Sequence, residues 1–175
     1  MQPFKVLITT FLAAATVTAL PSPDSEIIVE FQPLSIKDVV YSVPQHDIHC
    51  GGNNPQGKTY NGDQIWETTV AAFQRIKNGT HIPEKNGWPK KYEWNEKIQF
   101  KKVLGCSESN ENWEFPILEH GIFDGNNAKP EEVDRVVIRR IGKREMAYCG
   151  LVTHLDAPKP KKPEKGKDYY AVCEA

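Results

Sequence analysis

The sequence predicts an α+β fold, in which one α-helix packs on a central antiparallel β-sheet. The stretch 63–77 repeats apolar residues at the spacing of an amphipathic helix. After it come short runs rich in β-branched and aromatic residues, separated by Gly, Pro and Asn, which is typical of antiparallel strands joined by turns. A helix followed by a series of strands is an α+β order. Four cysteines predict that disulfides staple this fold.

The first nineteen residues have the pattern of a secretory signal peptide. Lys5 precedes the apolar run 6–15, and Val17 and Ala19 stand at the −3 and −1 positions of a cleavage site. The run is too short to span a membrane, so we expect a secreted protein with no membrane partner. Residues 20–45 form a predicted N-terminal extension, either an edge hairpin or a pro-segment that is later removed. The domain itself is expected to cover 46–175.

All four cysteines, Cys50, Cys106, Cys149 and Cys173, follow the predicted signal peptide. An even number of cysteines in an exported chain predicts disulfides, and four cysteines allow three connectivities. A zinc site is the alternative, but the sequence has no Cys-x-x-Cys motif and no cluster of Cys and His. We therefore expect disulfides, and neither a metal nor any other cofactor.

The predicted helix begins at Asp63, a residue type that favours the N-cap. Its apolar face consists of Ile65, Thr69, Ala72, Phe73 and Ile76. Asn78 and Gly79 end the helix, and together with Thr80 they form an N-glycosylation sequon on a surface turn. Asn78 is therefore a candidate glycosylation site. Many such sequons stay empty, and the sequence does not decide its occupancy.

Six segments after the helix have the composition of strands. They are 88–92, 98–104, 113–118, 133–138, 147–153 and 169–173. Three of them supply the side chains of interest: Glu114, Arg135 and His154. A carboxylate inside an apolar strand is costly unless it is paired or used, and a carboxylate, a guanidinium and an imidazole together suit acid–base chemistry on a phosphate. The alternative is a structural Glu114–Arg135 ion pair.

The charge distribution argues against a strongly cationic nucleic-acid binder. The whole chain has a net charge of −1, and residues 57–175 carry twenty Lys and Arg against eighteen acidic residues, a net +2. A dedicated nucleic-acid-binding domain is typically far more basic. The one biased segment is 158–167, where five lysines alternate with prolines. It is either a solvated, stiff loop or a basic finger that lies on a phosphate backbone.

Five motifs occur in an order that resembles the fungal guanyl-specific ribonucleases and their sarcin-type ribotoxin relatives. They are Trp88-Pro89-Lys90-Lys91-Tyr92, Glu114-Phe115-Pro116-Ile117, Asp134-Arg135-Val136-Val137, Gly150-Leu151-Val152-Thr153-His154, and Tyr170 shortly before Cys173. The resemblance covers about residues 46–175. It implies the microbial ribonuclease fold, and the disulfide pairs Cys50–Cys173 and Cys106–Cys149.

The same resemblance implies a metal-independent reaction on single-stranded RNA or ribosomal RNA by a monomer. Glu114 would take the proton from a ribose 2′-hydroxyl, which attacks the adjacent phosphorus to give a 2′,3′-cyclic phosphate. His154 would protonate the leaving 5′-oxygen, and Arg135 would neutralise charge on the phosphoryl oxygens. Tyr170 stands where the family has a Phe that packs against the phosphate. It keeps the ring and adds a hydroxyl.

Two regions depart from the family pattern. Lys90 replaces a His and Trp88 a Tyr, so Lys90 keeps a positive charge near the phosphate but lacks an acceptor nitrogen. In the base-recognition loop, Tyr92 is placed to stack on a base and Glu96 to accept hydrogen bonds from guanine, while Trp94 replaces an Asn. The first hypothesis is thus an endoribonuclease with a guanine preference. The alternative is a catalytically impaired, RNase-like secreted effector that binds RNA or a host protein without cleavage.

Overall fold

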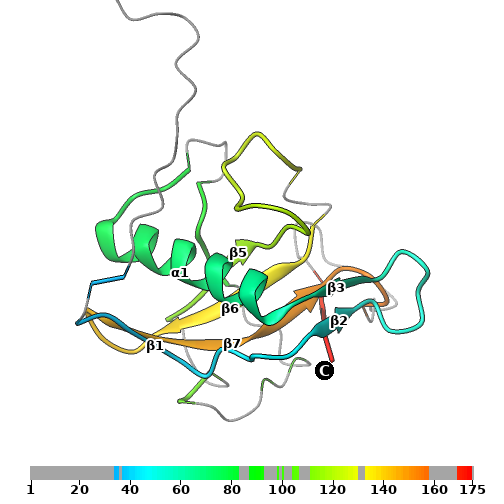
Figure 1. Ribbon diagram of the computed structural model, residues 1–175, viewed down its shortest axis with the longest axis horizontal. Coiled ribbons are helices and arrows are strands. Elements are labelled where there is room, and N and C mark those ends of the chain that lie inside the picture. Colours follow the sequence, from blue (N-terminus) through cyan, green and yellow to red (C-terminus); the bar gives the residue numbers. More distant parts are fainter. Residues whose placement is uncertain are drawn as a thin grey trace, which may run out of the picture. The chain divides into compact units, whose positions relative to one another are not determined.

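The computed structural model describes residues 34–35, 37–82, 87–92, 98, 100, 104–106, 111–129, 133–157 and 169–174. Within these residues there are one α-helix, a mixed sheet of six strands and a separate two-stranded hairpin (Figure 1). The predicted α+β class is therefore confirmed. The predicted signal peptide and most of the extension 20–45 lie outside the described residues. No helix among the described residues is long and apolar enough to cross a membrane.

The six-stranded sheet has the order β1-β7-β6-β5-β4, and β8 also pairs with β7. Its strands are β1 (Val39–Tyr41), β4 (Lys90–Lys91), β5 (Asn112–Pro116), β6 (Arg135–Arg140), β7 (Glu145–Thr153) and β8 (Ala171–Val172). The pairs β4–β5, β5–β6, β6–β7 and β7–β8 are antiparallel, as the sequence predicts. The pair β1–β7 is parallel. Parallel neighbours need a long connection, which the intervening hairpin, helix and strands supply.

A hairpin of β2 (Ile48–Cys50) and β3 (Lys58–Tyr60) precedes the helix. The sequence analysis does not predict these strands, because each has only three residues and glycines flank the turn between them. Conversely, the described apolar residues of the predicted strand 98–104, which are Ile98, Phe100 and Leu104, are not in a strand. Ile98 and Phe100 are buried nonetheless, whereas Leu104 is exposed.

The helix α1 (Gly62–Asn78) begins one residue before the predicted start, and its N-cap is Asn61 rather than Asp63. The Asn61 side chain accepts a hydrogen bond from the backbone N–H of Gln64, and the Gln64 side chain accepts one from Asn61. This reciprocal capping box satisfies two N–H groups that a helix start leaves without partners. Asp63 lies in the first turn, where a negative charge interacts favourably with the positive end of the helix dipole. Gly79, with φ of 64°, ends the helix.

The sheet separates two apolar layers. On the helix side, α1 packs against β5 and β6, and Phe73 of the helix shares a core with Phe115, Ile138 and Leu151. The opposite face, which we call the far side, has its own smaller core. Phe100 belongs to this smaller core. Its ring lies against Gly150, since a Cβ placed on Gly150 would come within 3.0 Å of it.

Both disulfides implied by the family resemblance are present. Cys50 pairs with Cys173 and thereby joins the hairpin to the end of the chain. Cys106 pairs with Cys149 on the far side of the sheet. Because all four cysteines are used in these two bonds, the alternative of a cysteine zinc site is excluded.

Candidate active site

Three neighbouring strands bring the predicted catalytic side chains to the far side of the sheet. Glu114 lies in β5, Arg135 opens β6, and His154 directly follows β7. In the sheet register Arg135 is opposite both Pro116 and Val152. Residues two apart in a strand share a face, so Glu114 and His154 lie on the same face as Arg135, one on each neighbouring strand. The convergence that the sequence predicts is thus present in the structure.

Glu114 and Arg135 form a nearly buried ion pair. Nη1 of Arg135 donates to Oε1 of Glu114 at 2.9 Å, and only 8% of the Glu114 side chain and 4% of the Arg135 side chain are exposed. A charge-assisted hydrogen bond of this kind is short and strong. Each charge would be costly to bury without the other, so the pair fixes the position of both side chains.

The guanidinium of Arg135 lies between two aromatic rings. Its central carbon is 5.1 Å from the ring centre of Trp88 and 5.0 Å from that of Tyr170. Nη1 of Arg135 also donates to the hydroxyl of Tyr170. Cations are attracted to aromatic faces, so both rings fix the position of the guanidinium as well as covering it.

His154 is oriented by the backbone. Its Nδ1 lies 3.0 Å from the carbonyl oxygen of Tyr169. A carbonyl can only accept a hydrogen bond, so Nδ1 carries a hydrogen and Nε2 is the nitrogen that gains and loses the titrating proton. The imidazole ring lies 4.5 Å from the ring of Tyr170. Tyr170 therefore contacts Arg135 and His154 at once.

Lys90 and Trp88 border the carboxylate. Lys90 is directly opposite Glu114 in the β4–β5 pair, and its ammonium lies 4.2 Å from the Trp88 ring centre. Trp88 is fully buried, and its indole Nε1 has no hydrogen-bond partner among the described residues. The Trp88 ring thus contacts the cations of Lys90 and Arg135 as well as the ring of Phe123, and direct contact with substrate stays a prediction.

Tyr92 lies deep in the same layer. It is 5% exposed, and its ring is 5.8 Å from Phe100 and 5.9 Å from Tyr170. Burial raises the pKa of the Tyr92 phenol, and the charge of Glu114 raises it further. The phenol is therefore neutral at physiological pH. Stacking of Tyr92 on a base, as predicted, would require one of these ring contacts to open.

The structure does not test every predicted feature of the site and its surroundings. Trp94, Glu96 and the lysine-rich segment 158–167 lie outside the described residues, so their roles stay predictions. Asn78 is the exposed last residue of α1, a position that is compatible with glycosylation. Whether it carries sugar also stays a prediction.

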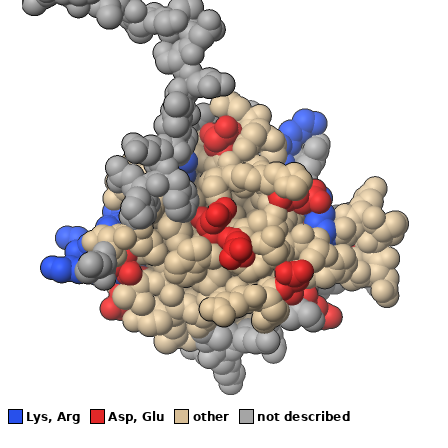
Figure 2. Space-filling view, viewed as in Figure 1, with Lys and Arg blue, Asp and Glu red and all other residues tan. Residues whose placement is uncertain are grey.

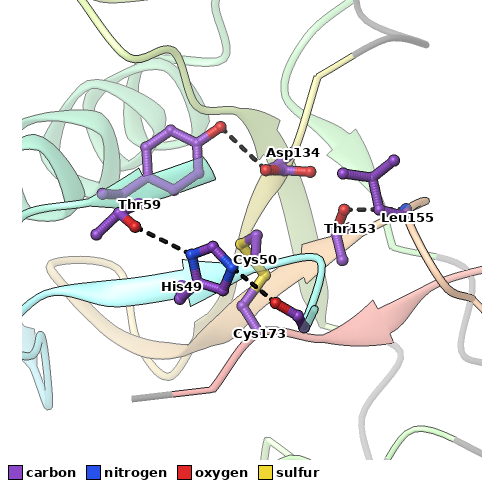
Figure 3. Close-up of a disulfide and its surroundings, with 9 residues drawn as sticks. His49, Cys50, Thr59, Asp134, Thr153, Leu155 and Cys173 are labelled. Atoms are coloured by element: carbon purple, nitrogen blue, oxygen red, sulfur yellow. Dashed lines mark hydrogen bonds between the residues drawn. A yellow bond between two sulfur atoms is a disulfide. The ribbon is translucent and has the colours of Figure 1, made fainter. Parts of the chain in front are cut away.

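A pocket of about 350 Å³ opens beside His154. Its wall consists of Gln56, Lys58, Val133, Asp134, Thr153, His154 and Leu155. Asp134 is buried and accepts a hydrogen bond from the Tyr60 hydroxyl at 3.0 Å (Figure 3). Burial, and then the Asp134 charge, raises the pKa of the Tyr60 phenol, which therefore remains a donor.

The sequence analysis does not predict this pocket. Lys58 and Gln56 come from the hairpin that it misses, and neither stands in a motif. In the sequence, Asp134 was the best indication of this pocket, because an acidic residue directly before a buried strand needs a partner. Within the described residues, no three or more His, Cys, Asp or Glu side chains gather as they would around a metal ion.

Known protein families were compared with the whole chain. The family model described as ribonuclease matches residues 49–162. This match covers more than half of the chain and includes Glu114, Arg135 and His154. Curated proteins gave no match.

Proposed function

The chain belongs to the ribonuclease family, and from this premise we propose that it is a secreted, metal-independent endoribonuclease acting on single-stranded RNA. One observation carries the proposal: Glu114 and His154 flank Arg135 on adjacent strands of one sheet face. Neighbouring strands are about 4.8 Å apart. The two groups are therefore separated by roughly two strand spacings, which suits a single phosphodiester placed over Arg135.

The reaction is an in-line transesterification. Glu114 takes the proton of the ribose 2′-hydroxyl, and the oxygen forms a bond to the adjacent phosphorus. The bond from phosphorus to the 5′-oxygen breaks, and Nε2 of His154 supplies the proton to that oxygen. The products are a 2′,3′-cyclic phosphate and a free 5′-hydroxyl, and Arg135 stabilises the charge that builds on the phosphoryl oxygens.

The leaving nucleoside has a place beside His154. Since His154 protonates the 5′-oxygen, the nucleoside attached to that oxygen must lie on the His154 side, away from Glu114. The pocket lined by Lys58, Val133 and Leu155 lies there. Val133 and Leu155 in its wall suit a base or ribose, and Lys58, which shares the wall with the acidic Asp134, suits the next phosphate.

Charge on the molecule supports RNA binding on the far side of the sheet. Figure 2 shows the view from the α1 side, where acidic side chains lie across the described surface and the described Lys and Arg side chains lie toward its edges. A polyanion is repelled by such a face. The cations of the site, Lys90 and Arg135, lie on the far side.

The decisive experiment is cleavage of single-stranded RNA in the presence of a chelator, with analysis of the ends. We expect 2′,3′-cyclic phosphate ends, and a loss of about 10²–10⁴ in rate in Glu114→Gln and in His154→Gln. Glu145→Gln and His120→Gln change exposed residues of the same types and serve as matched controls. Cleavage that survives both site variants would contradict the mechanism. Comparison of homopolymers then tests the proposed guanine preference.

A second function is favoured by Lys90 and by the burial of the carboxylate. An ammonium in place of an imidazole cannot accept a proton, and Glu114 is only slightly exposed. Both features suit a secreted effector that binds RNA or a host protein without cutting it. Intact RNA that binds the protein in a salt-dependent manner would favour this function over the first.

A further inference from the structure

Tyr170 occupies the centre of the site, although its side chain is only slightly exposed. The residue is 4% exposed. The guanidinium of Arg135 lies 5.0 Å from the ring centre of Tyr170. The imidazole ring of His154 lies 4.5 Å from the same ring. Tyr170 therefore stands between the group that would bind the phosphate and the group that would protonate the leaving oxygen.

The hydroxyl of Tyr170 accepts a hydrogen of Arg135 Nη1 that a phosphate bound at this nitrogen would use. Nη1 of a guanidinium carries two hydrogens. In Arg135 one is donated to Oε1 of Glu114 and the other to the Tyr170 hydroxyl. A phosphoryl oxygen can bind Nη1 only by replacing one of these acceptors. Replacing Glu114 would remove the proposed base from its place, so the Tyr170 hydroxyl is the acceptor to be replaced.

We propose that the Tyr170 hydroxyl occupies the position of a phosphoryl oxygen on Arg135, and that it sets the affinity of the site for phosphate groups. This inference rests on the proposed function, since it assigns Arg135 to the substrate phosphate. Tyr170 is a positioning residue in this scheme: in the free protein it holds the guanidinium against Glu114, and it moves aside when a phosphate binds.

The test is the affinity for inorganic phosphate, measured by titration calorimetry on the full, oxidised protein. Tyr170→Phe keeps the ring and removes only the competing hydroxyl, so we expect phosphate to bind on the order of tenfold more tightly than to the unchanged protein. Tyr148→Phe is the matched control, because it removes a buried hydroxyl from the helix-side core. It should leave phosphate affinity unchanged. Equal or weaker binding to Tyr170→Phe, or no binding to either protein, would overturn the inference.

A second measurement does not depend on the variant folding. With 3-fluorotyrosine incorporated, the fluorine NMR signal of Tyr170 should shift as phosphate is added, with the same midpoint as the calorimetric titration. A signal that stays fixed while phosphate binds would show that the hydroxyl is not displaced, and would also overturn the inference.

These measurements separate the inference from the proposed function. Phosphate binding requires no cleavage, so tighter binding to Tyr170→Phe together with uncut RNA would support the inference and contradict the nuclease. Cleavage that depends on Glu114 and His154, with no change of affinity in Tyr170→Phe, would do the reverse.

Discussion

The two sides of the central sheet bury their residues for different purposes. On the helix side, Phe73, Phe115 and Ile138 fill an apolar core whose value is the removal of surface from water. On the far side, Glu114 and Arg135 are buried almost as completely, yet each is a charge that would prefer water. The helix-side layer is apolar where it meets the sheet, whereas the far-side layer combines a smaller apolar core with an ion pair that is tolerated because its charges neutralise each other.

The difference between the two faces shows where the side chains of the candidate site lie in this fold. Successive residues of a strand point to opposite faces. Glu114 therefore belongs to the site, while its chain neighbour Phe115 belongs to the helix-side core. The same holds for Arg135 and Val136 in β6. Because the helix-side residues fix the strands, the far-side residues are free to carry charge.

The largest effects, and the strongest test of the difference between the two faces, are expected from the variants Glu114→Gln and Phe115→Ala. The first should lower the rate of RNA cleavage by about 10² or more. It also leaves the Arg135 charge without its counter-charge, but the amide oxygen of Gln still accepts from Arg135, so we expect a smaller loss of stability than in the second variant. The second should lower the free energy of unfolding by about 3–5 kcal/mol through the cavity it leaves. Urea unfolding and cleavage per folded molecule measure the two effects. A larger loss of stability in Glu114→Gln than in Phe115→Ala would contradict the division of roles.

The next effect concerns Asp134, a buried carboxylate next to the helix-side core. Tyr60→Phe removes the hydroxyl that donates to Asp134 at 3.0 Å. A hydrogen bond to a charged group contributes about 1.5–3 kcal/mol, and we expect the free energy of unfolding at neutral pH to fall by about this amount. Tyr148→Phe, whose hydroxyl has no partner among the described residues, is the control and should have little effect. Equal effects of the two variants would refute a specific role of the Asp134 bond.

The sequence predicted that Glu114, Arg135 and His154 belong to one site. Each stands in or directly after an apolar strand, but the order of the family motifs was needed to favour a site over a structural Glu114–Arg135 ion pair. The disulfide pairs came from the family resemblance and not from spacing. The parallel pairing of β1 with β7 and the short β2–β3 hairpin were not predicted, since a three-residue strand has too few residues to show alternation.

Other features could not be predicted because they depend on contacts between distant segments. The N-cap was assigned to Asp63 rather than Asn61, since two Asx residues stand close together and only the Gln64 contact decides between them. The Tyr170 hydroxyl gave no sign of its bond to Arg135, which is 35 residues away in the chain. The pocket beside His154 required the hairpin to fold back onto the end of β7.

A smaller effect is expected at that pocket. Lys58→Gln removes the cation proposed to contact the phosphate beyond the scissile bond, while leaving Glu119, its exposed partner. Exposed ion contacts contribute up to about 1 kcal/mol, so kcat/KM for a short RNA with a further phosphate should fall roughly two- to fivefold. Hydrolysis of a nucleoside 2′,3′-cyclic phosphate, which has no leaving nucleoside, should be unchanged. Lys143→Gln, at an exposed turn, is the control, and a loss on both substrates would argue against the pocket.

The smallest effect tests whether β1 is held to the sheet by charge. Asp38, directly before β1, accepts from Lys77 of α1 at 2.6 Å and from Arg144, between β6 and β7, at 2.9 Å. The hydrogen bond from Lys77 is the largest cause that lowers the pKa of Asp38. The folded state therefore binds the Asp38 proton less readily than the unfolded state. Its stabilising contribution is complete above the ordinary Asp pKa of about 4 and is lost as the pH falls through the lowered value.

Asp38→Asn should accordingly flatten the dependence of unfolding free energy on pH below about pH 4. Urea unfolding at a series of pH values measures this slope. Asp47→Asn removes an exposed carboxylate six residues from β1 and controls for the change in net charge. If Asp38→Asn and the unchanged protein lose stability in parallel as acid is added, the two bonds to Asp38 do not hold β1, and the backbone pairing with β7 alone must do so.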